Sequence, residues 1–287
     1  MRTVLVTGAS SGIGKATATY LAAHGWRVLA GVRTPAAPGG LIEEIRLDVT
    51  QDLGEAVETV RRLVGTNGLQ ALVNNAGIGD IFPLEFTSAE RFRRVFDVNV
   101  FGLLAVTQAV LPDLHRGRGR IVNMGSIGGR LTIPLGGTLT ASKHAVEAIS
   151  DALRMELFTA GIPVTCLEPA SINSGSAEKL ASAAGEADLP EGARERYSGP
   201  MKTFVQRMLA GETSGSPPEV VARAVFEILE MPHPPARKVV GRHGLVLRVL
   251  ARWVPDAWRE ALLRRLFLGG GRFGSRRFFA PRAGESG

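Results

Sequence analysis

A short apolar run near the start of the chain leads directly into a glycine-rich turn and then into a helical pattern. The turn is Thr-Gly-Ala-Ser-Ser-Gly-Ile-Gly at residues 7–14, and the helix is expected over residues 13–24, before Gly25 ends it. Glycines at such a turn let the backbone bend tightly and approach an anion, and the helix start offers unpaired N–H groups and a positive dipole end. The strand–turn–helix unit therefore predicts a site for a nucleotide diphosphate.

Apolar, strand-like runs alternate with helical patterns beyond this unit. The longest helices are expected at residues 88–114 and 142–160. Strands separated by helices are typical of a parallel sheet covered on both faces. We therefore predict an α/β fold, a doubly wound parallel sheet of the Rossmann type with three layers, α/β/α. The strands are expected at residues 4–6, 27–32, 43–47, 69–73, 120–124 and 164–167.

The composition fits a folded protein in a reducing compartment. Hydrophobic residues make up 45% of the 287, which is enough for a full core. A single cysteine, Cys166, excludes an internal disulfide framework, and the N-terminal apolar run is too short for a secretion signal. No uninterrupted stretch of about 18 apolar residues indicates a transmembrane helix. We expect a cytoplasmic protein and predict no metal site.

Charge is concentrated at the C-terminal end. Residues 237–287 hold 12 Lys and Arg against 3 Asp and Glu, so this segment carries +9 and the other 236 residues −2. A body without excess positive charge argues against nucleic-acid binding. Residues 237–268 predict a basic amphipathic extension and residues 269–287 a disordered tail. The extension either docks on the body or contacts a membrane surface or a partner.

Residues 174–218 depart from the strand–helix rhythm and are rich in Ser, Ala, Gly and Glu. We place this segment within a first domain of residues 1–236, as either an ordinary surface helix or a lid over an apolar substrate. The helix is indicated by apolar residues at helical spacing, namely Met201, Phe204, Val205, Met208 and Leu209.

Further markers follow the expected strands. Asp48-Val49 comes after the third strand, and Asn74-Asn75-Ala76-Gly77 after the fourth. Asn99 lies in the next helix, Ser126 follows the fifth strand, and Lys143 and Pro169 complete the set. With the glycine-rich turn, these markers resemble the short-chain dehydrogenase/reductase family in order and spacing over roughly residues 1–230.

The resemblance implies a nicotinamide cofactor and assigns residues to it. The turn would hold the diphosphate and ribose, Asp48 and Val49 the adenine, and Lys143 the nicotinamide ribose. Asn75, Ala76 and Gly77 would line the central stretch of the cofactor. The cofactor-binding residues are thus Gly8, Ser10, Ser11, Gly12, Ile13, Gly14, Asp48, Val49, Asn75, Ala76, Gly77, Lys143, Pro169, Ala170 and Ile172.

The residues after the second strand favour NADP(H) over NAD(H). NAD-binding folds place an acid there for the ribose 2′-hydroxyl, whereas a 2′-phosphate needs a cation. The segment reads Gly31-Val32-Arg33-Thr34 and has no acid. Arg33 and Thr34 could hold the phosphate, or Arg33 could be a solvated charge at the end of the strand.

Position 139 departs from the family pattern. In the family, a tyrosine four residues before the lysine moves a proton, while a serine polarises the carbonyl and an asparagine holds a water. Here Ser126, Lys143 and Asn99 match, but Leu139 replaces the tyrosine. Neither Tyr20 nor Tyr197 can be assumed to substitute for it. A second departure is Ala170, where the family has glycine after proline; its methyl is expected near the nicotinamide pocket.

The leucine leaves several functions open. The substrate could need little proton transfer, as an iminium ion, quinone or enone would, with Lys143 as an electrostatic stabiliser or a distant proton source. The pocket could instead serve a cyclase, dehydratase or isomerase, or bind without reaction, or the leucine could be engineered into an ordinary reductase. We favour an NADP(H)-dependent oxidoreductase of altered mechanism, acting on a lipophilic carbonyl, enone or imine-like substrate. The two long helices suggest a homodimer, unless the C-terminal extension caps them.

Overall fold

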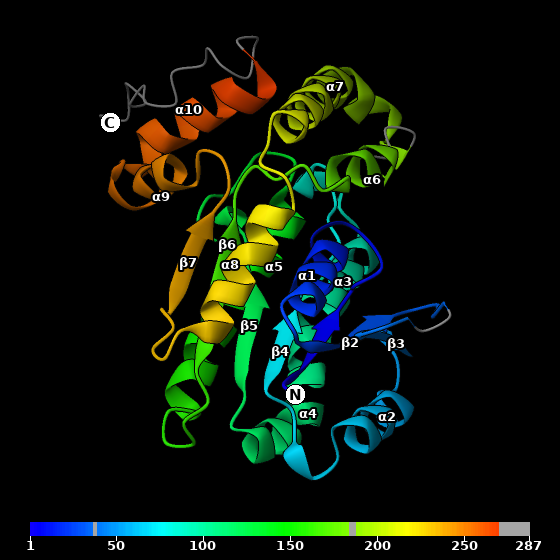
Figure 1. Cartoon of the computed structure of the whole chain (residues 1–287). Helices are drawn as coiled ribbons and strands as arrows, with labels where there is room; N and C mark the ends of the chain where they lie inside the picture. Colours follow the sequence, from blue (N-terminus) through cyan, green and yellow to red (C-terminus); the bar gives the residue numbers. More distant parts are fainter. Residues whose placement is uncertain (37–38, 184–187, 270–287) are drawn as a thin grey trace, which may run out of the picture.

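The computed structural model describes residues 1–36, 39–183 and 188–269. A parallel seven-stranded sheet forms its centre, in the order β3-β2-β1-β4-β5-β6-β7 (Figure 1). The order reverses between β1 and β4, which is the switch point of a doubly wound sheet. The fold class predicted from the sequence is confirmed. The strands are β1 (Thr3–Thr7), β2 (Arg27–Val32), β3 (Ile42–Arg46), β4 (Ala71–Asn74), β5 (Arg120–Met124), β6 (Val164–Pro169) and β7 (Arg237–Val240).

Helices cover both faces of the sheet because successive strand residues point to opposite sides. On one face, Val4 and Val6 of β1 pack against α1 (Gly12–Ala23) and α8 (Glu219–Glu230). On the other, Leu5 packs against α2 (Gly54–Val64), α4 (Leu103–Gly117) and α5 (Gly137–Glu156). The two cores fix the sheet, so the turns at the carboxyl ends of the strands are held in place.

The first long helix expected from the sequence is interrupted. It consists of α3 (Ala89–Phe96), the π-helical segment η3 (Asp97–Gly102) and α4. Together the three segments form one helical stretch, Ala89–Gly117, that is long and apolar enough to cross a membrane by length and composition alone. Val106, Val110 and Leu114 instead bury their side chains in the core, as in the core helix of a globular protein.

The C-terminal part adds elements above the carboxyl ends of the strands (Figure 1). The predicted lid segment contains α6 (Ser176–Ala183) and α7 (Glu191–Thr213). Residues 237–268 contribute β7, which the sequence analysis did not predict, and then α9 (Gly244–Trp253) and α10 (Asp256–Leu268). Of the predicted disordered tail, only Gly269 lies within the described residues.

Candidate active site

The glycine-rich turn between β1 and α1 forms a tight cradle. Gly8 and Gly12 have φ of +65° and +53°, which favour glycine. A Cβ on Gly14 would lie 2.2 Å from the Gly8 carbonyl oxygen, so a side chain there would force the turn apart. Ser11 caps α1 without a side-chain hydrogen bond, which leaves the first N–H groups of the helix free for an anion.

The end of β4 is tied to this cradle. The Thr7 hydroxyl accepts hydrogen bonds of 3.0 Å from the backbone N–H groups of Asn75 and Ala76. The Asn75 amide donates to the carbonyl oxygens of Thr7 and Gly8, at 2.9 and 3.2 Å. The turn and the Asn75–Gly77 segment therefore form one surface, as the implied cofactor site requires.

The segment after β6 approaches the cradle from the other side. A Cβ on Gly12 would lie 2.9 Å from the Ser174 carbonyl oxygen. Lys179 of α6 donates a 3.0 Å hydrogen bond to the Ser11 hydroxyl. The sequence analysis did not single out Lys179, because its proximity to the turn depends on how α6 packs.

The residues assigned to the adenosine end gather after β2 and β3. Arg33 and Thr34 are exposed at the end of β2. Asp48 accepts hydrogen bonds from the backbone N–H and the hydroxyl of Thr50, which lower the pKa of its carboxyl group, and the Arg33 charge lowers it further. Val49 packs against the backbone of η3, where a Cβ on Gly102 would lie 2.7 Å from a Val49 methyl.

Pro169, Ala170 and Ile172 lie where β6 meets β7. The Ala170 N–H donates a 2.8 Å hydrogen bond to the Val240 carbonyl oxygen. Its methyl lies 3.5 Å from the position that a Cβ on Gly244 would occupy, so it faces the start of α9. Ile172 is buried in the core beside Gly241.

Asn99 is held inside the π-helical segment. It is 1% exposed, and its side-chain oxygen accepts a 2.8 Å hydrogen bond from the Ile78 N–H. Its amide donates to the Ile78 carbonyl oxygen and to the Ser142 hydroxyl, both at 2.9 Å. A Cβ on Gly77 would lie 3.3 Å from the Asn99 oxygen and 3.8 Å from the Lys143 ammonium, so the two groups converge on the β4 turn.

Lys143 extends from α5 toward β5 and donates a 2.7 Å hydrogen bond to the Met124 carbonyl oxygen. Removal of its ammonium group from water lowers its pKa to about 8, although Cys166 and Glu147 oppose the shift. Ser126 follows β5, and its hydroxyl oxygen accepts a 3.0 Å hydrogen bond from the Gly128 N–H. That contact leaves the hydroxyl proton available for donation.

Leu139 lies one helical turn before Lys143, so both side chains are on the same side of α5. A Cβ on Gly79 would lie 3.3 Å from a Leu139 methyl and 2.4 Å from a Leu180 methyl. Leu139 and Leu180 of α6 therefore cover the same stretch of backbone. Where the family resemblance implies a phenol, the chain presents hydrocarbon in an apolar setting.

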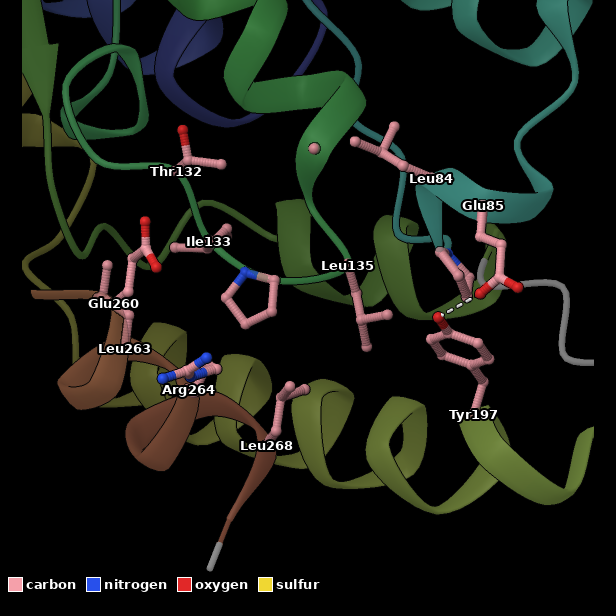
Figure 2. Close-up of a pocket in the computed structure, with 13 residues that line it drawn as sticks. Leu84, Glu85, Thr132, Ile133, Leu135, Tyr197, Glu260, Leu263, Arg264 and Leu268 are labelled. Carbon is pink, nitrogen blue, oxygen red and sulfur yellow. Dashed lines mark hydrogen bonds between the residues drawn. The ribbon is translucent and has the colours of Figure 1, made fainter. Parts of the chain in front are cut away.

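A cavity of about 480 Å³ opens beside the N-terminus of α5 (Figure 2). Leu84 and the loop before α5 form one wall, and α7 and α10 form the others. Tyr197 of α7 donates a 2.7 Å hydrogen bond to Glu85, and burial together with Glu85 raises the pKa of its phenol. The residues that line the cavity are Pro83, Leu84, Glu85, Thr132, Ile133, Pro134, Leu135, Gly137, Tyr197, Glu260, Leu263, Arg264 and Leu268.

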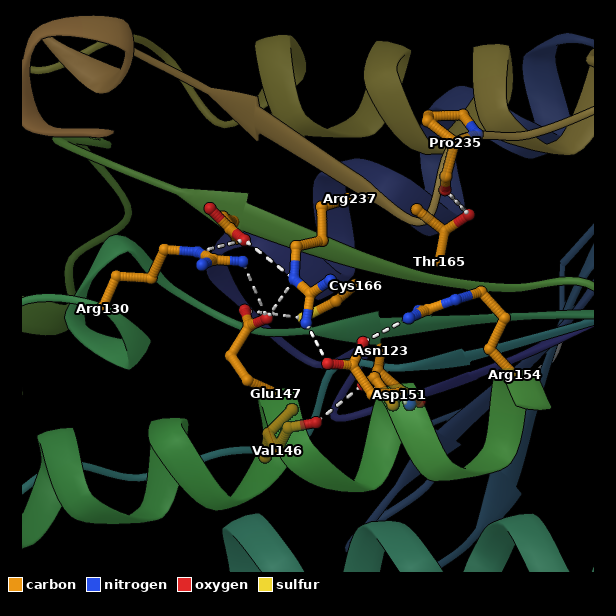
Figure 3. Close-up of polar contacts among 12 residues, drawn as sticks. Asn123, Arg130, Val146, Glu147, Asp151, Arg154, Thr165, Cys166, Pro235 and Arg237 are labelled. Atoms are coloured by element: carbon orange, nitrogen blue, oxygen red, sulfur yellow. Dashed lines mark hydrogen bonds and ion pairs between the residues drawn. The ribbon is translucent and has the colours of Figure 1, made fainter. Parts of the chain in front are cut away.

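An ionic cluster lies between α5, β6 and β7 (Figure 3), and its Glu147 is one helical turn after Lys143 on α5. The carboxylate of Glu168, 1% exposed, accepts a 2.9 Å hydrogen bond from Arg130. Glu147 accepts one of 2.8 Å from Arg237 and one of 3.0 Å from the Cys166 thiol. Burial raises the pKa of Glu168. The sequence gives no periodic signal for this cluster, because its members come from α5, β6, β7 and the segment that holds Arg130.

Comparison with known proteins agrees with this geometry. The family model for short chain dehydrogenase matches residues 2–185. The chain therefore belongs to the short-chain dehydrogenase/reductase family, which is a family of oxidoreductases.

Three similar proteins span nearly the whole chain. A 3-ketodihydrosphingosine reductase of Bacteroides thetaiotaomicron is 32% identical over 91% of this chain and 96% of its own length. An NADPH-dependent 3-dehydrocapnine reductase of Ornithobacterium rhinotracheale is 33% identical over 89% and 94%. The solved structure of a short chain dehydrogenase from Burkholderia cenocepacia in complex with NADP is 26% identical, covers 93% and 99%, and has a TM-score of 0.67.

Proposed function

We propose that this protein is an NADP(H)-dependent oxidoreductase that reduces a lipophilic carbonyl, enone or imine-like compound without a tyrosine as proton donor. The observation that carries the proposal is the combination of a complete cradle with Leu139 one turn from Lys143. The names of the two relatives, both reductases, support the direction of the reaction.

The cofactor preference rests on charge. The turn at residues 8–14 would hold the diphosphate, and Arg33 at the end of β2 would hold the 2′-phosphate. Arg33 makes no hydrogen bond or ion pair with the part of the chain that the structure describes, so its guanidinium is available for a bidentate contact. The NADP complex and the NADPH-dependent relative support the same choice.

The nicotinamide supplies hydride when the cofactor is bound, and the chain supplies position and protons. Ser126 would donate a hydrogen bond from its hydroxyl to the carbonyl oxygen and so polarise the bond, while it keeps its own proton. Lys143, with a pKa of about 8, is a far better acid than an ordinary lysine and would deliver the proton. Leu139 and Leu180 would exclude water from this path.

The substrate would enter the cavity at the start of α5, where Gly137 lies two residues before Leu139, and the lining suits an amphiphilic compound. Leu84, Leu135 and Leu263 offer apolar surface, while Glu85 with Tyr197 and Glu260 with Arg264 provide polar groups. A long-chain ketone with a polar end, such as 3-ketodihydrosphingosine, fits this character. Tyr197 is better suited to bind such a polar end than to replace the missing acid, because its pKa is raised.

Transfer of label from deuterated NADPH tests the proposal. The purified protein is incubated with NADPH deuterated at C4 and with 3-ketodihydrosphingosine, a long-chain enone and an imine, and the products are analysed by mass spectrometry. We expect deuterium on the reduced carbon. Conversion without deuterium and without loss of NADPH would assign the chain to a non-redox activity instead, such as cyclisation, dehydration or isomerisation.

We also propose a homodimer through the η3 and α5 region. Phe101, Met155 and Phe158 are 60%, 71% and 80% exposed there, and the burial of such large apolar side chains would favour association. Sedimentation of the wild type and of a Met155→Ser/Phe158→Ser variant would test it; a monomeric wild type would contradict it. A cytoplasmic location stays a prediction.

A further inference from the structure

The C-terminal helices each expose an apolar stripe. Within each stripe the residues are four apart, so they share one side of their helix. Their exposed fractions run from 48% to 76%, far above those of core residues. The stripes are Leu245, Val249 and Trp253 on α9, and Trp258, Leu262 and Leu266 on α10.

Docking on the body uses a different side of α10. Leu263 is 4% exposed, and Phe267 packs against Phe204 of α7 with ring centroids 5.3 Å apart. Arg207 of α7 donates a 2.7 Å hydrogen bond to the Arg265 carbonyl oxygen near the end of α10. The extension therefore docks as one sequence interpretation expected, yet both stripes remain outside that contact.

Positive charge borders the stripes. The segment α9–α10 contains five arginines against two acids, Asp256 and Glu260. Arg248, Arg252 and Arg265 are exposed, and the Arg252 guanidinium lies 5.4 Å from the Trp253 ring centroid. Arginine beside tryptophan and leucine is the combination that suits the interface between anionic headgroups and acyl chains.

One of these helices, α10, also lines the cavity. Leu263, Arg264 and Leu268 of α10 line it, from the side of the helix next to the body (Figure 2). Both helices lie beyond the carboxyl ends of the strands, at the end of the molecule where α6 and α7 also lie (Figure 1). A surface that contacts α10 from outside is thus separated from the cavity by the thickness of one helix.

We propose that α9 and α10 dock this end of the protein on an anionic lipid bilayer, with both helices in the plane of the interface. With 10 and 13 residues, neither is long enough to span a bilayer, which needs about 20. The arginines contact the headgroups and the stripes enter the acyl boundary. A lipophilic substrate could then pass from the bilayer to the cavity along α10.

A second copy of the chain is the weaker occupant. The exposed residues Phe101, Met155 and Phe158 lie in the η3 and α5 region that was proposed above for self-association, outside α9 and α10. The excess of arginine on α9–α10 would meet the same excess on a symmetric partner, because an isologous interface brings identical patches together. A negatively charged lipid surface can pair with the arginines through its headgroups and bury the apolar stripes among its acyl chains.

Vesicle flotation tests the docking surface. The full-length protein should float with vesicles of phosphatidylcholine and phosphatidylserine, and much less with phosphatidylcholine alone. Arg248→Gln/Arg252→Gln should lower the partition coefficient about 25-fold, at about fivefold for each charge removed. Trp253→Ser/Trp258→Ser should abolish flotation. Met155→Ser/Phe158→Ser, which removes equally exposed apolar residues elsewhere, should float like the wild type.

Tryptophan emission provides a second readout, since Trp26 is buried and only Trp253 and Trp258 are exposed. Emission should shift to the blue on addition of anionic vesicles, and NADPH binding, which depends on the distant cradle, should be unchanged in every variant. The proposal is overturned if the wild type floats with neither vesicle. It is equally overturned if the tryptophan variant's sole effect is to dissociate a dimer.

Discussion

Leu139→Tyr tests whether the site is a reductase that lacks only its usual acid. The new phenol would lie one helical turn from Lys143, on the same side of α5. A positioned general acid contributes about 10²–10⁴-fold to a rate, or about 3–5 kcal/mol of barrier. Reduction of an ordinary ketone should therefore be gained rather than lost.

Crowding sets how much of that gain is realised. Leu180 and Leu139 both pack over Gly79. A Cβ placed on Gly79 would lie 2.4 Å from a Leu180 methyl. Overpacking strains a site by about 1–3 kcal/mol, and displacement of the new phenol by that strain would cut the gain in transition-state stabilisation to about 2 kcal/mol, or about 30-fold. Combining Leu139→Tyr with Leu180→Ala should relieve the crowding and raise the gain toward the full range.

The assay is steady-state NADPH oxidation with a simple aryl ketone. Leu139→Phe is the matched control, because it has the bulk of tyrosine without the hydroxyl. The phenylalanine variant should stay at the wild-type rate, and NADPH affinity should be equal in all variants. Equal rates for the tyrosine and phenylalanine variants would refute the reasoning. Loss of a native activity on Leu139→Tyr would show that leucine belongs to a different chemistry.

Three further predictions concern charge. Arg33→Ala should weaken NADPH binding about 10- to 100-fold in a fluorescence titration, since a charge-assisted bond contributes about 1.5–3 kcal/mol, and an equal loss for NADH would contradict its role. If Lys143 delivers the proton, kcat for reduction should be flat below its pKa of about 8 and fall as the ammonium deprotonates above it. The fall should be absent in Lys143→Arg, and a wild-type kcat independent of pH from about 6 to 10 would exclude that role. Arg130→Met should lower the free energy of unfolding by about 2–3 kcal/mol in urea titrations, because it leaves the Glu168 carboxylate buried without its partner. The loss is below that of a fully buried pair because the Arg130 side chain is 32% exposed, and no loss would show that Glu168 is compensated by Arg237.

Five of the six strands predicted from the sequence are buried at all but at most one residue, and the sixth, β3, is mostly half-buried. β7 was missed because it is short and its four residues are all half-buried, with Arg237 and Lys238 opening it. Such an edge strand has no apolar run, and only its pairing with β6 defines it. The predicted start of the second long helix at residue 142 was late, since α5 begins at Gly137 and carries Leu139.

Local motifs located the candidate site better than composition did. The cradle could be predicted because glycine is needed where φ is positive and where backbones approach closely, as at Gly8 and Gly14. The Lys179–Ser11 contact could not, because it joins residues 168 apart. The sequence also could not predict that one apolar side of α10 packs on the body while the other stays exposed, because the two apolar stripes look alike in sequence.

Titration of NADPH and NADH into the wild-type protein, followed by nicotinamide fluorescence, tests the central claim most directly. Saturable binding of NADPH, tighter than that of NADH and lost in Gly14→Ala, is the expected result, since a Cβ at residue 14 would meet the Gly8 carbonyl oxygen at 2.2 Å. Absence of saturable binding of either nucleotide would contradict the claim that the cofactor site is intact although Leu139 replaces the tyrosine.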